Sequence, residues 1–317
     1  MNQRSLLLIA TLVLAACAKE TTQTTATTGT STTTAATTTH AASLPNELKE
    51  GLQTPESVLF DVEQDLYFVS NINGSPTAAD NNGYISRLNP DTLQGELKFI
   101  EGGHAIDGKN VATLNAPKGL AVMGDTLYVA DLTTVRRFDR KTGSPKGEVK
   151  IPGSTFLNDL ATDGKVVYVS DSGLKAGAGG NLDPTGTDAI WEISGDKAKK
   201  IASGKDLNRP NGLTVVDGHL WAVSFGANEL YEVRKGKKTH VVKIPKGSLD
   251  GLVHLTDGTF LVSSWESNSV FRGAAAGPFT EVIKNVTSPA DIDYDNKRKR
   301  VLVPHFTENR ITIHPLE

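Results

Sequence analysis

The chain has 317 residues and a formal net charge of -3. It contains no long run of Lys and Arg, which argues against a nucleic-acid-binding surface, so we expect no nucleic-acid partner. Its single cysteine excludes an intrachain disulfide. Hydrophobic residues make up 38% of the chain and glycine occurs 30 times, a composition that suits a globular β protein rich in turns.

Residues 1–16 have the pattern of a secretion signal. Arg4 supplies a short positive region, and the apolar run that follows is too short to span a bilayer as a helix. The run ends in Leu-Ala-Ala before Cys17, which resembles a bacterial lipobox. That resemblance implies a lipoprotein, with cleavage before Cys17 and a lipid on its thiol. An ordinary signal peptide is the alternative.

The residues after Cys17 predict where the protein is held. Ala18 stands where Gram-negative sorting would need Asp for the inner membrane. By that analogy the lipid on Cys17 holds the protein in the outer membrane of the bacterial cell envelope, facing the periplasm. Residues 17–43 are mostly Thr and Ala without apolar periodicity, which predicts a disordered tether. The folded domain is then expected over residues 44–317.

From about residue 46 onward, short segments rich in β-branched and aromatic residues follow Gly and Asp turns, the pattern of β-strands. Six segments share one register: Pro or Leu, a variable residue, a small or acidic residue, then an apolar residue. They begin about 40 residues apart, with two longer gaps. Units of about 40–50 residues with four strands are typical of a β-propeller. We therefore predict an all-β, six-bladed β-propeller, with segments beginning at Pro55, Pro117, Leu157, Pro210, Leu249 and Pro289.

Other parts of the chain have predicted places in this ring. The longer gaps are expected to hold long loops at residues 75–83 and 173–188, which are rich in Gly, Asn and Asp. Residues 44–53 are expected to add an outer strand to the last blade and so close the ring. Trp265 and His305 are expected to line the end of the channel opposite the repeated segments.

The variable residue of each segment is expected where a connection enters the innermost strand, so all six should surround one end of the channel. Four of them carry carboxylate or amide oxygens, which suit calcium because it tolerates irregular coordination completed by water. Their two negative charges balance a divalent cation. A structural zinc site is disfavoured without Cys or His, although zinc, magnesium and manganese remain alternatives. These ring positions are Glu56, Lys118, Asn158, Asn211, Asp250 and Ala290, and the predicted metal ligands are Glu56, Asn158, Asn211 and Asp250.

From about residue 50 onward, the chain resembles the family that contains gluconolactonase, regucalcin (senescence marker protein) and luciferin-regenerating enzyme. The resemblance implies a six-bladed propeller with a divalent metal in its channel, held by the four predicted ligands. Paraoxonases and diisopropylfluorophosphatase resemble this set too, so the match does not choose between subfamilies. It rests on Pro55-Glu56-Ser57, Asn158-Asp159, Asn211-Gly212 and Asp250-Gly251.

The resemblance implies hydrolysis of a small-molecule lactone or another activated ester. The metal would act as a Lewis acid and a carboxylate as general base. Asp250 is the first candidate for the base, and Asp159, next to the ligand Asn158, is the second. Lys118 is expected either to bind an acidic substrate or developing oxyanion, or to form a salt bridge with Glu56 or Asp159.

Two functions of different classes follow. The first is an envelope-anchored, divalent-metal-dependent hydrolase of lactones or esters, which needs an open coordination position and a base beside it. The second is a non-catalytic calcium-binding propeller that binds a ligand or a protein partner in the periplasm, with every coordination position filled. A third, a lyase or sensor of the broader propeller group, would not need Glu56 and Asp250 together. We expect a monomer.

Overall fold

The computed structural model describes residues 45–106, 108 and 110–316. The signal peptide predicted over residues 1–16, the lipidated Cys17 and the tether predicted over residues 17–43 lie outside the described residues. Within these described ranges, no helical segment has the length and apolar character that crossing a bilayer requires.

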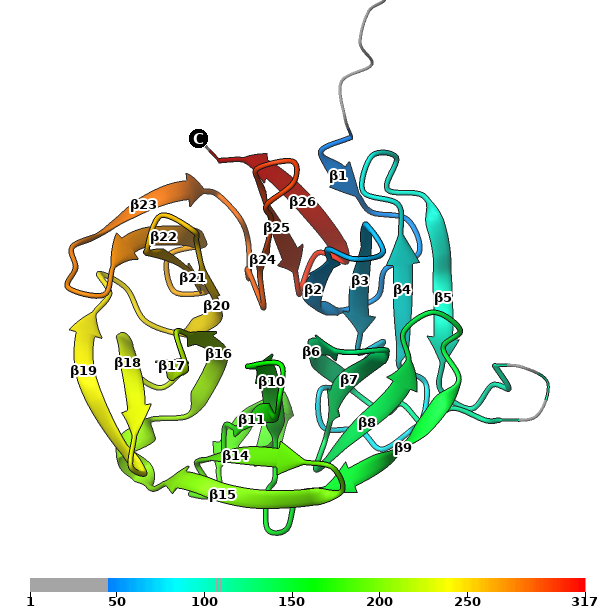
Figure 1. Ribbon diagram of the computed structural model, residues 1–317, viewed down its shortest axis with the longest axis horizontal. Helices are drawn as coiled ribbons and strands as arrows, with labels where there is room; N and C mark the ends of the chain where they lie inside the picture. Colours follow the sequence, from blue (N-terminus) through cyan, green and yellow to red (C-terminus); the bar gives the residue numbers. More distant parts are fainter. Residues whose placement is uncertain (1–44, 107, 109, 317) are drawn as a thin grey trace, which may run out of the picture. The chain divides into compact units, whose positions relative to one another are not determined.

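Six four-stranded antiparallel sheets surround a central channel, each with its first strand innermost (Figure 1). The predicted all-β, six-bladed β-propeller is confirmed. Blades 1 and 2 consist of β2 (Pro55–Asp61), β3 (Leu66–Asn71), β4 (Tyr84–Leu88), β5 (Gly95–Glu101), β6 (Pro117–Met123), β7 (Thr126–Asp131), β8 (Thr134–Asp139) and β9 (Pro145–Lys150). Blades 3 and 4 consist of β10 (Leu157–Thr162), β11 (Val167–Asp171), β14 (Ala189–Ser194), β15 (Lys197–Ser203), β16 (Pro210–Val216), β17 (His219–Ser224), β18 (Glu229–Arg234) and β19 (Lys237–Lys243). Blades 5 and 6 consist of β20 (Leu249–His254), β21 (Thr259–Ser264), β22 (Ser269–Ala274), β23 (Phe279–Lys284), β24 (Asp293–Asp295), β25 (Arg300–His305), β26 (Arg310–Pro315) and β1 (Glu47–Leu48).

The first strand of the described residues closes the ring, as predicted. β1 pairs with β26 and becomes the outer strand of blade 6. Arg310 reinforces this pairing because its Nη1 donates to Glu47 Oε1 at 2.6 Å. Near the channel, Ser57 of β2 and Asp291 form a parallel bridge between blades 1 and 6. The junction between blades 1 and 6 is therefore held both at the outer rim of the propeller and beside its axis.

Blade 3 carries an insertion between its second and third strands. Residues 173–188, expected to be a long loop, contain a hairpin of β12 (Leu174–Ala176) and β13 (Leu182–Pro184), with a short 3-10 helix, η1 (Ala178–Gly180), at its tip. A second 3-10 helix, η2 (Lys205–Leu207), precedes β16.

The hydrophobic core consists of six clusters, each shared by two neighbouring blades. The cluster between blades 2 and 3, for example, packs Val135 and Val149 against Leu157 and Val169. The other five join blades 1 and 2, 3 and 4, 4 and 5, 5 and 6, and 6 and 1. Because each blade buries both faces against its neighbours, its stability depends on a closed ring.

Replacing Leu48 tests the closing strand. Leu48 packs against the cluster between blades 6 and 1, so Leu48→Asp should cost about 1–2 kcal/mol. That cost should lower the melting temperature by about 2–8 °C, measured by thermal unfolding. Glu50→Ala, which changes an exposed residue just after β1, is the control and should leave it unchanged. Equal melting temperatures for the three proteins would contradict a closing role for β1.

Candidate functional site

Each innermost strand begins with a β-bulge. Pro55 of β2 pairs with Asn71 of β3, and Val58 pairs with Val69. An advance of three residues on β2 therefore matches an advance of only two residues on β3. The same shift occurs in β6, β10, β16 and β20, and residues 289–293 show it against β25. A bulge sets two residues opposite one and re-aims a side chain. The ring position and the residue after it therefore have different orientations.

Serines on the second strands support several of these bulges. Ser70 of β3 accepts a hydrogen bond from the backbone N–H of Ser57 at 2.9 Å. Ser170 of β11 accepts one from Asp159, also at 2.9 Å, and a serine of β21 does the same for β20. These bonds satisfy backbone N–H groups that the bulge takes out of the ladder, so the sequence of the second strand helps to hold the first.

Neighbouring innermost strands approach each other closely at the axis. A Cβ atom on Gly212 would lie 2.2 Å from the backbone oxygen of Asp250, and one on Gly119 would lie 2.5 Å from the Cα of Asp159. No side chain fits in either place, so glycine is required by packing. This close approach brings residues of different blades together around the channel.

One small cavity collects the five polar ring positions. Its volume is about 70 Å³, and we call it the ring cavity. The five polar side chains are between 1% and 6% exposed. The sixth ring position, Ala290, is buried and adds no polar group. The structure thus gathers residues from five blades, namely Glu56, Lys118, Asn158, Asn211 and Asp250.

Each of the four predicted metal ligands has one buried oxygen without a hydrogen-bond partner. Among the described residues, ten buried side-chain atoms lack a partner, and five of them belong to residues that border the ring cavity. Burying an oxygen without a partner is costly, and such costs are seldom tolerated without a compensating ligand. The five atoms are Glu56 Oε2, Asn158 Oδ1, Asn211 Oδ1, Asp250 Oδ1 and Trp265 Nε1.

The donor set fits a hard divalent cation such as calcium. Two carboxylates and two amide oxygens are ligands that calcium accepts, with water completing the shell. No group of three His, Cys, Asp or Glu side chains suited to a metal occurs among the described residues. The predicted ligand set does not form such a group because half of its donors are amides. The two carboxylates supply the charge, and the two amides supply neutral oxygens.

Charge is poorly balanced inside the ring cavity. Burial raises the pKa of Glu56 well above its ordinary value, and the charges of Asp250 and Asp291 raise it further, while Lys118 lowers it. Burial likewise raises the pKa of Asp250, helped by Asp291, while the side chains of Trp265 and Asn211 lower it. Both carboxyl groups would become easier to ionise if a cation lay between them.

Lys118 is the one lysine of the ring positions, and it is fully buried. Its Nζ donates to the backbone oxygen of Ala116 at 3.1 Å and lies 4.3 Å from the centre of the Phe156 ring. The ion pairs between described residues do not include Lys118, so the salt bridge considered from the sequence is not formed with Glu56 or Asp159. Burial lowers the pKa of Lys118 to about 8, against the opposing effect of Glu56.

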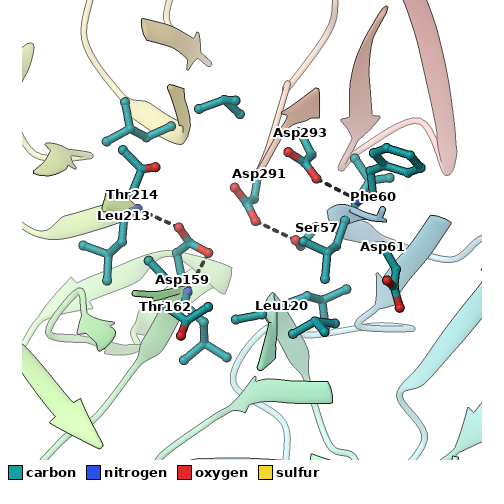
Figure 2. A pocket seen from close by; sticks show the side chains of 18 of the residues that line it. Ser57, Phe60, Asp61, Leu120, Asp159, Thr162, Leu213, Thr214, Asp291 and Asp293 are labelled. Atoms are coloured by element: carbon teal, nitrogen blue, oxygen red, sulfur yellow. Dashed lines mark hydrogen bonds between the residues drawn. The ribbon is translucent and has the colours of Figure 1, made fainter. Parts of the chain in front are cut away.

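In blades 1, 3 and 6, the residue after the ring position borders a second cavity at the other end of the channel. This opposite cavity has a volume of about 430 Å³, and Asp159, Asp291 and Ser57 extend into it (Figure 2). Asp159 accepts backbone hydrogen bonds from Leu160 and Leu213, both at 2.6 Å. Both oxygens of Asp159 are thus in use, and the side chain does not border the ring cavity.

The expected place of Trp265 and His305 is wrong. Trp265 borders the ring cavity, and His305 pairs with Pro289 at the same end of the channel. The reason is strand direction: the second strand of a blade runs antiparallel to the first, so its end lies beside the start of the innermost strand. His305 is fully buried and its Nε2 lies 2.8 Å from the Thr312 hydroxyl.

Sequence reasoning missed two further features. Asp291 follows the ring position Ala290, as Asp159 follows Asn158, so the shared register could have identified it. Its Oδ2 accepts a hydrogen bond from the Ser57 hydroxyl at 2.5 Å. Burial raises the pKa of Asp291 to about 7. The second missed feature is a set of aromatic residues at the ring cavity, which share one register position directly after the second strand of a blade.

Comparison with known proteins supports the fold. No protein-family model matches the chain, and no curated protein matches its sequence. A gluconolactonase from Xanthomonas campestris has a TM-score of 0.62 and 16% identity, covering 85% of this chain and 88% of its own. Virginiamycin B lyase from Staphylococcus aureus has a TM-score of 0.58 and 14% identity, covering 85% and 98%.

A catalytically inactive variant of that lyase with quinupristin is also similar, with a TM-score of 0.56, 13% identity and coverage of 86% and 99%. Both the gluconolactonase and the lyase are six-bladed propellers. At such identities the likeness establishes the shared fold. The resemblance noted in the sequence is therefore supported at the level of the fold.

Asp293 should make stability depend on pH. Burial raises the pKa of this half-buried carboxyl to about 6, although the backbone N–H groups of Phe60 and Tyr294 lower it. The native state therefore binds more protons than the unfolded state between about pH 4 and 6, so this group's contribution to stability falls as pH rises. The melting temperature of Asp293→Asn, minus that of the wild type, should grow between pH 4 and 7. A difference that stays constant would contradict the raised pKa.

Proposed function

We propose that this chain is a divalent-metal-dependent hydrolase of lactones or related esters, held in the bacterial cell envelope. The observation that carries the proposal is the convergence of four unpartnered oxygens, from Glu56, Asn158, Asn211 and Asp250, on the ring cavity. The gluconolactonase among the structural neighbours agrees with lactone hydrolysis. The envelope location rests on the sequence around Cys17 alone.

The proposed chemistry assigns separate roles to the residues of the ring. A divalent cation, most suitably calcium, would supply Lewis acidity toward the carbonyl oxygen of the substrate. Asp250 would take a proton from the attacking water and return it to the leaving oxygen as the acyl C–O bond breaks. Burial favours this role because it raises the pKa of Asp250, whereas ligation of a cation would lower it.

Asp159 is the second candidate for the base. It lies one residue from Asn158, but both of its oxygens accept backbone hydrogen bonds and it borders the opposite cavity. These contacts favour Asp250 over Asp159. Lys118 borders the ring cavity and would donate to the oxyanion that forms on the substrate carbonyl.

The small volume of the ring cavity favours the alternative of a non-catalytic propeller. At about 70 Å³, it accommodates an ion with a few waters more readily than a whole ligand of ordinary size, which occupies a pocket of about 300–1,000 Å³. A non-catalytic calcium-binding propeller, with a ligand or protein partner in the periplasm, would have these dimensions. It would bind calcium as tightly as the enzyme but would hydrolyse no lactone.

Metal binding tests the ring site directly. The wild type should contain a stoichiometric divalent ion, and calcium at 100 times its dissociation constant should stabilise it by about 2.7 kcal/mol. Asp250→Asn should weaken calcium binding by at least about 100-fold, since even residues that only support a ligand cost 10–100-fold. Calcium titration by calorimetry and metal analysis measure both.

Asp293→Asn is the matched control because it removes a channel carboxylate from the opposite cavity, and its calcium affinity should equal that of the wild type. If the wild type binds no divalent ion and calcium does not change its melting temperature, the proposal fails. Metal binding with no hydrolysis across a panel of lactones and esters would favour the non-catalytic alternative.

Lys118→Met separates the two effects of the buried lysine. Removing its positive charge should tighten calcium binding about tenfold, because like charges repel, and should slow lactone hydrolysis about 10²–10³-fold in kcat, the loss typical of an oxyanion donor. Lys165→Met, at an exposed turn, is the control. An unchanged kcat would remove Lys118 from the proposed mechanism.

A further inference from the structure

One register position supplies an aromatic wall beside the ring cavity. Phe225, Trp265 and Phe306 each follow the second strand of blades 4, 5 and 6. Their backbone N–H groups donate to the backbone oxygen of the residue before the repeated segments that begin at Pro210, Leu249 and Pro289, at 2.9, 3.0 and 3.1 Å. The Trp265 ring lies 5.9 Å from Phe225 and 5.2 Å from Phe306. The same backbone bond in three adjacent blades holds the three rings together as one wall.

The rest of the border is also apolar. Phe156 and Leu174 are buried, and Pro76 is half-buried. Leu182 of β13 is 37% exposed, so it marks the rim of the cavity. Because the hairpin of β12 and β13 supplies both Leu174 and Leu182, apolar surface is continuous from the buried ring to the solvent.

Apart from the proposed metal ligands, the ring cavity has few polar side chains that could bind a substrate. Among the described residues that border the ring cavity, the polar side chains are the five ring residues and Trp265. Four of the five ring residues are the proposed metal ligands, which leaves Lys118 Nζ and the indole N–H of Trp265. A sugar lactone such as δ-gluconolactone carries several hydroxyl groups, and each one buried without a partner weakens binding.

The indole N–H of Trp265 has no hydrogen bond of ordinary length, although the indole lies close enough to Asp250 to lower the pKa of that carboxyl group. Its Nε1 is buried, and an indole nitrogen can only donate. A buried donor is costly unless it finds an acceptor. An ester or lactone oxygen bound beside the ring would be such an acceptor.

We propose that the apolar border of the ring cavity, from the aromatic wall to Leu182 at its rim, selects lactones or esters with an apolar acyl part over polyhydroxylated sugar lactones, and that Trp265 is a hydrogen-bond donor to all of them. The aromatic wall and Leu182 contact the alkyl part of the substrate, and Trp265 Nε1 donates to an oxygen of its reacting group. This inference rests on the proposed function and goes further by naming its substrate class.

Matched lactones of one ring size provide the test. The calcium-loaded full chain is assayed with δ-gluconolactone, δ-valerolactone, δ-octalactone and δ-decalactone. We expect kcat/KM for δ-valerolactone to exceed that for δ-gluconolactone at least tenfold, and to rise about two- to fourfold for each added methylene that is buried. A flat series, or a preference for δ-gluconolactone, overturns the inference.

Three variants assign the effect to residues. Leu182→Asp should remove most of the gain from chain length, so that kcat/KM for δ-decalactone falls toward that for δ-valerolactone. Val62→Asp, which alters an exposed apolar residue at the opposite cavity, should change neither. Trp265→Phe keeps an aromatic ring but removes the N–H, so kcat/KM should fall about tenfold for every δ-lactone, whatever its chain length. A loss confined to long chains overturns the hydrogen-bond role.

Binding of lactams distinguishes failure of this inference from failure of the proposed function. Calorimetry with the lactam analogues of δ-valerolactone and δ-decalactone, which resist hydrolysis, measures selection without reaction. Tighter binding of the longer lactam without hydrolysis of any lactone would keep the apolar selection and overturn the enzyme. Hydrolysis without a chain-length effect on lactam binding would do the reverse. If no lactam binds and no lactone reacts, both proposals fail.

Discussion

Every blade of this protein has two apolar faces and can bury them only against two neighbours. The six core clusters are therefore all shared between adjacent blades, including the one that joins blade 6 to blade 1. Closure of the ring follows from this requirement, and it places six innermost strands around one axis. Residues as distant in sequence as Glu56 and Asp250 border one cavity for that reason. The site is a consequence of how the core is buried.

Closure also removes polar side chains from water. The bulge at the start of each innermost strand re-aims side chains, so the channel has two polar ends of different character. At the ring cavity, four oxygens stay without partners. At the opposite cavity, Asp159 and Asp291 have hydrogen bonds from the backbone or from Ser57. A folded protein tolerates unpartnered buried oxygens most readily where a bound cation compensates them. This asymmetry is why we propose a metal site at the ring cavity.

The surroundings of the ring, more than the ring itself, underlie the substrate class that we propose. A gluconolactonase and a virginiamycin B lyase share this fold at 16% and 14% identity, and one fold serves many chemistries. In this chain the ring is bordered by the wall of Phe225, Trp265 and Phe306 and by the hairpin inserted in blade 3. These features come from loops and strand ends, which vary without disturbing the blades.

The sequence by itself determined the fold class, the number of blades and the closing strand, because strand periodicity and a repeat of about 40 residues are local signals. It also identified the ring positions, since one register recurs at Glu56, Asn158, Asn211 and Asp250. Only the tertiary structure decided which end of the channel each side chain faces. Asp159 borders the opposite cavity although its neighbour Asn158 borders the ring cavity, and Trp265 borders the ring cavity together with Asp250. A one-residue bulge and the antiparallel return of the second strand set those directions, and both are properties of strand pairing that one segment of sequence does not contain.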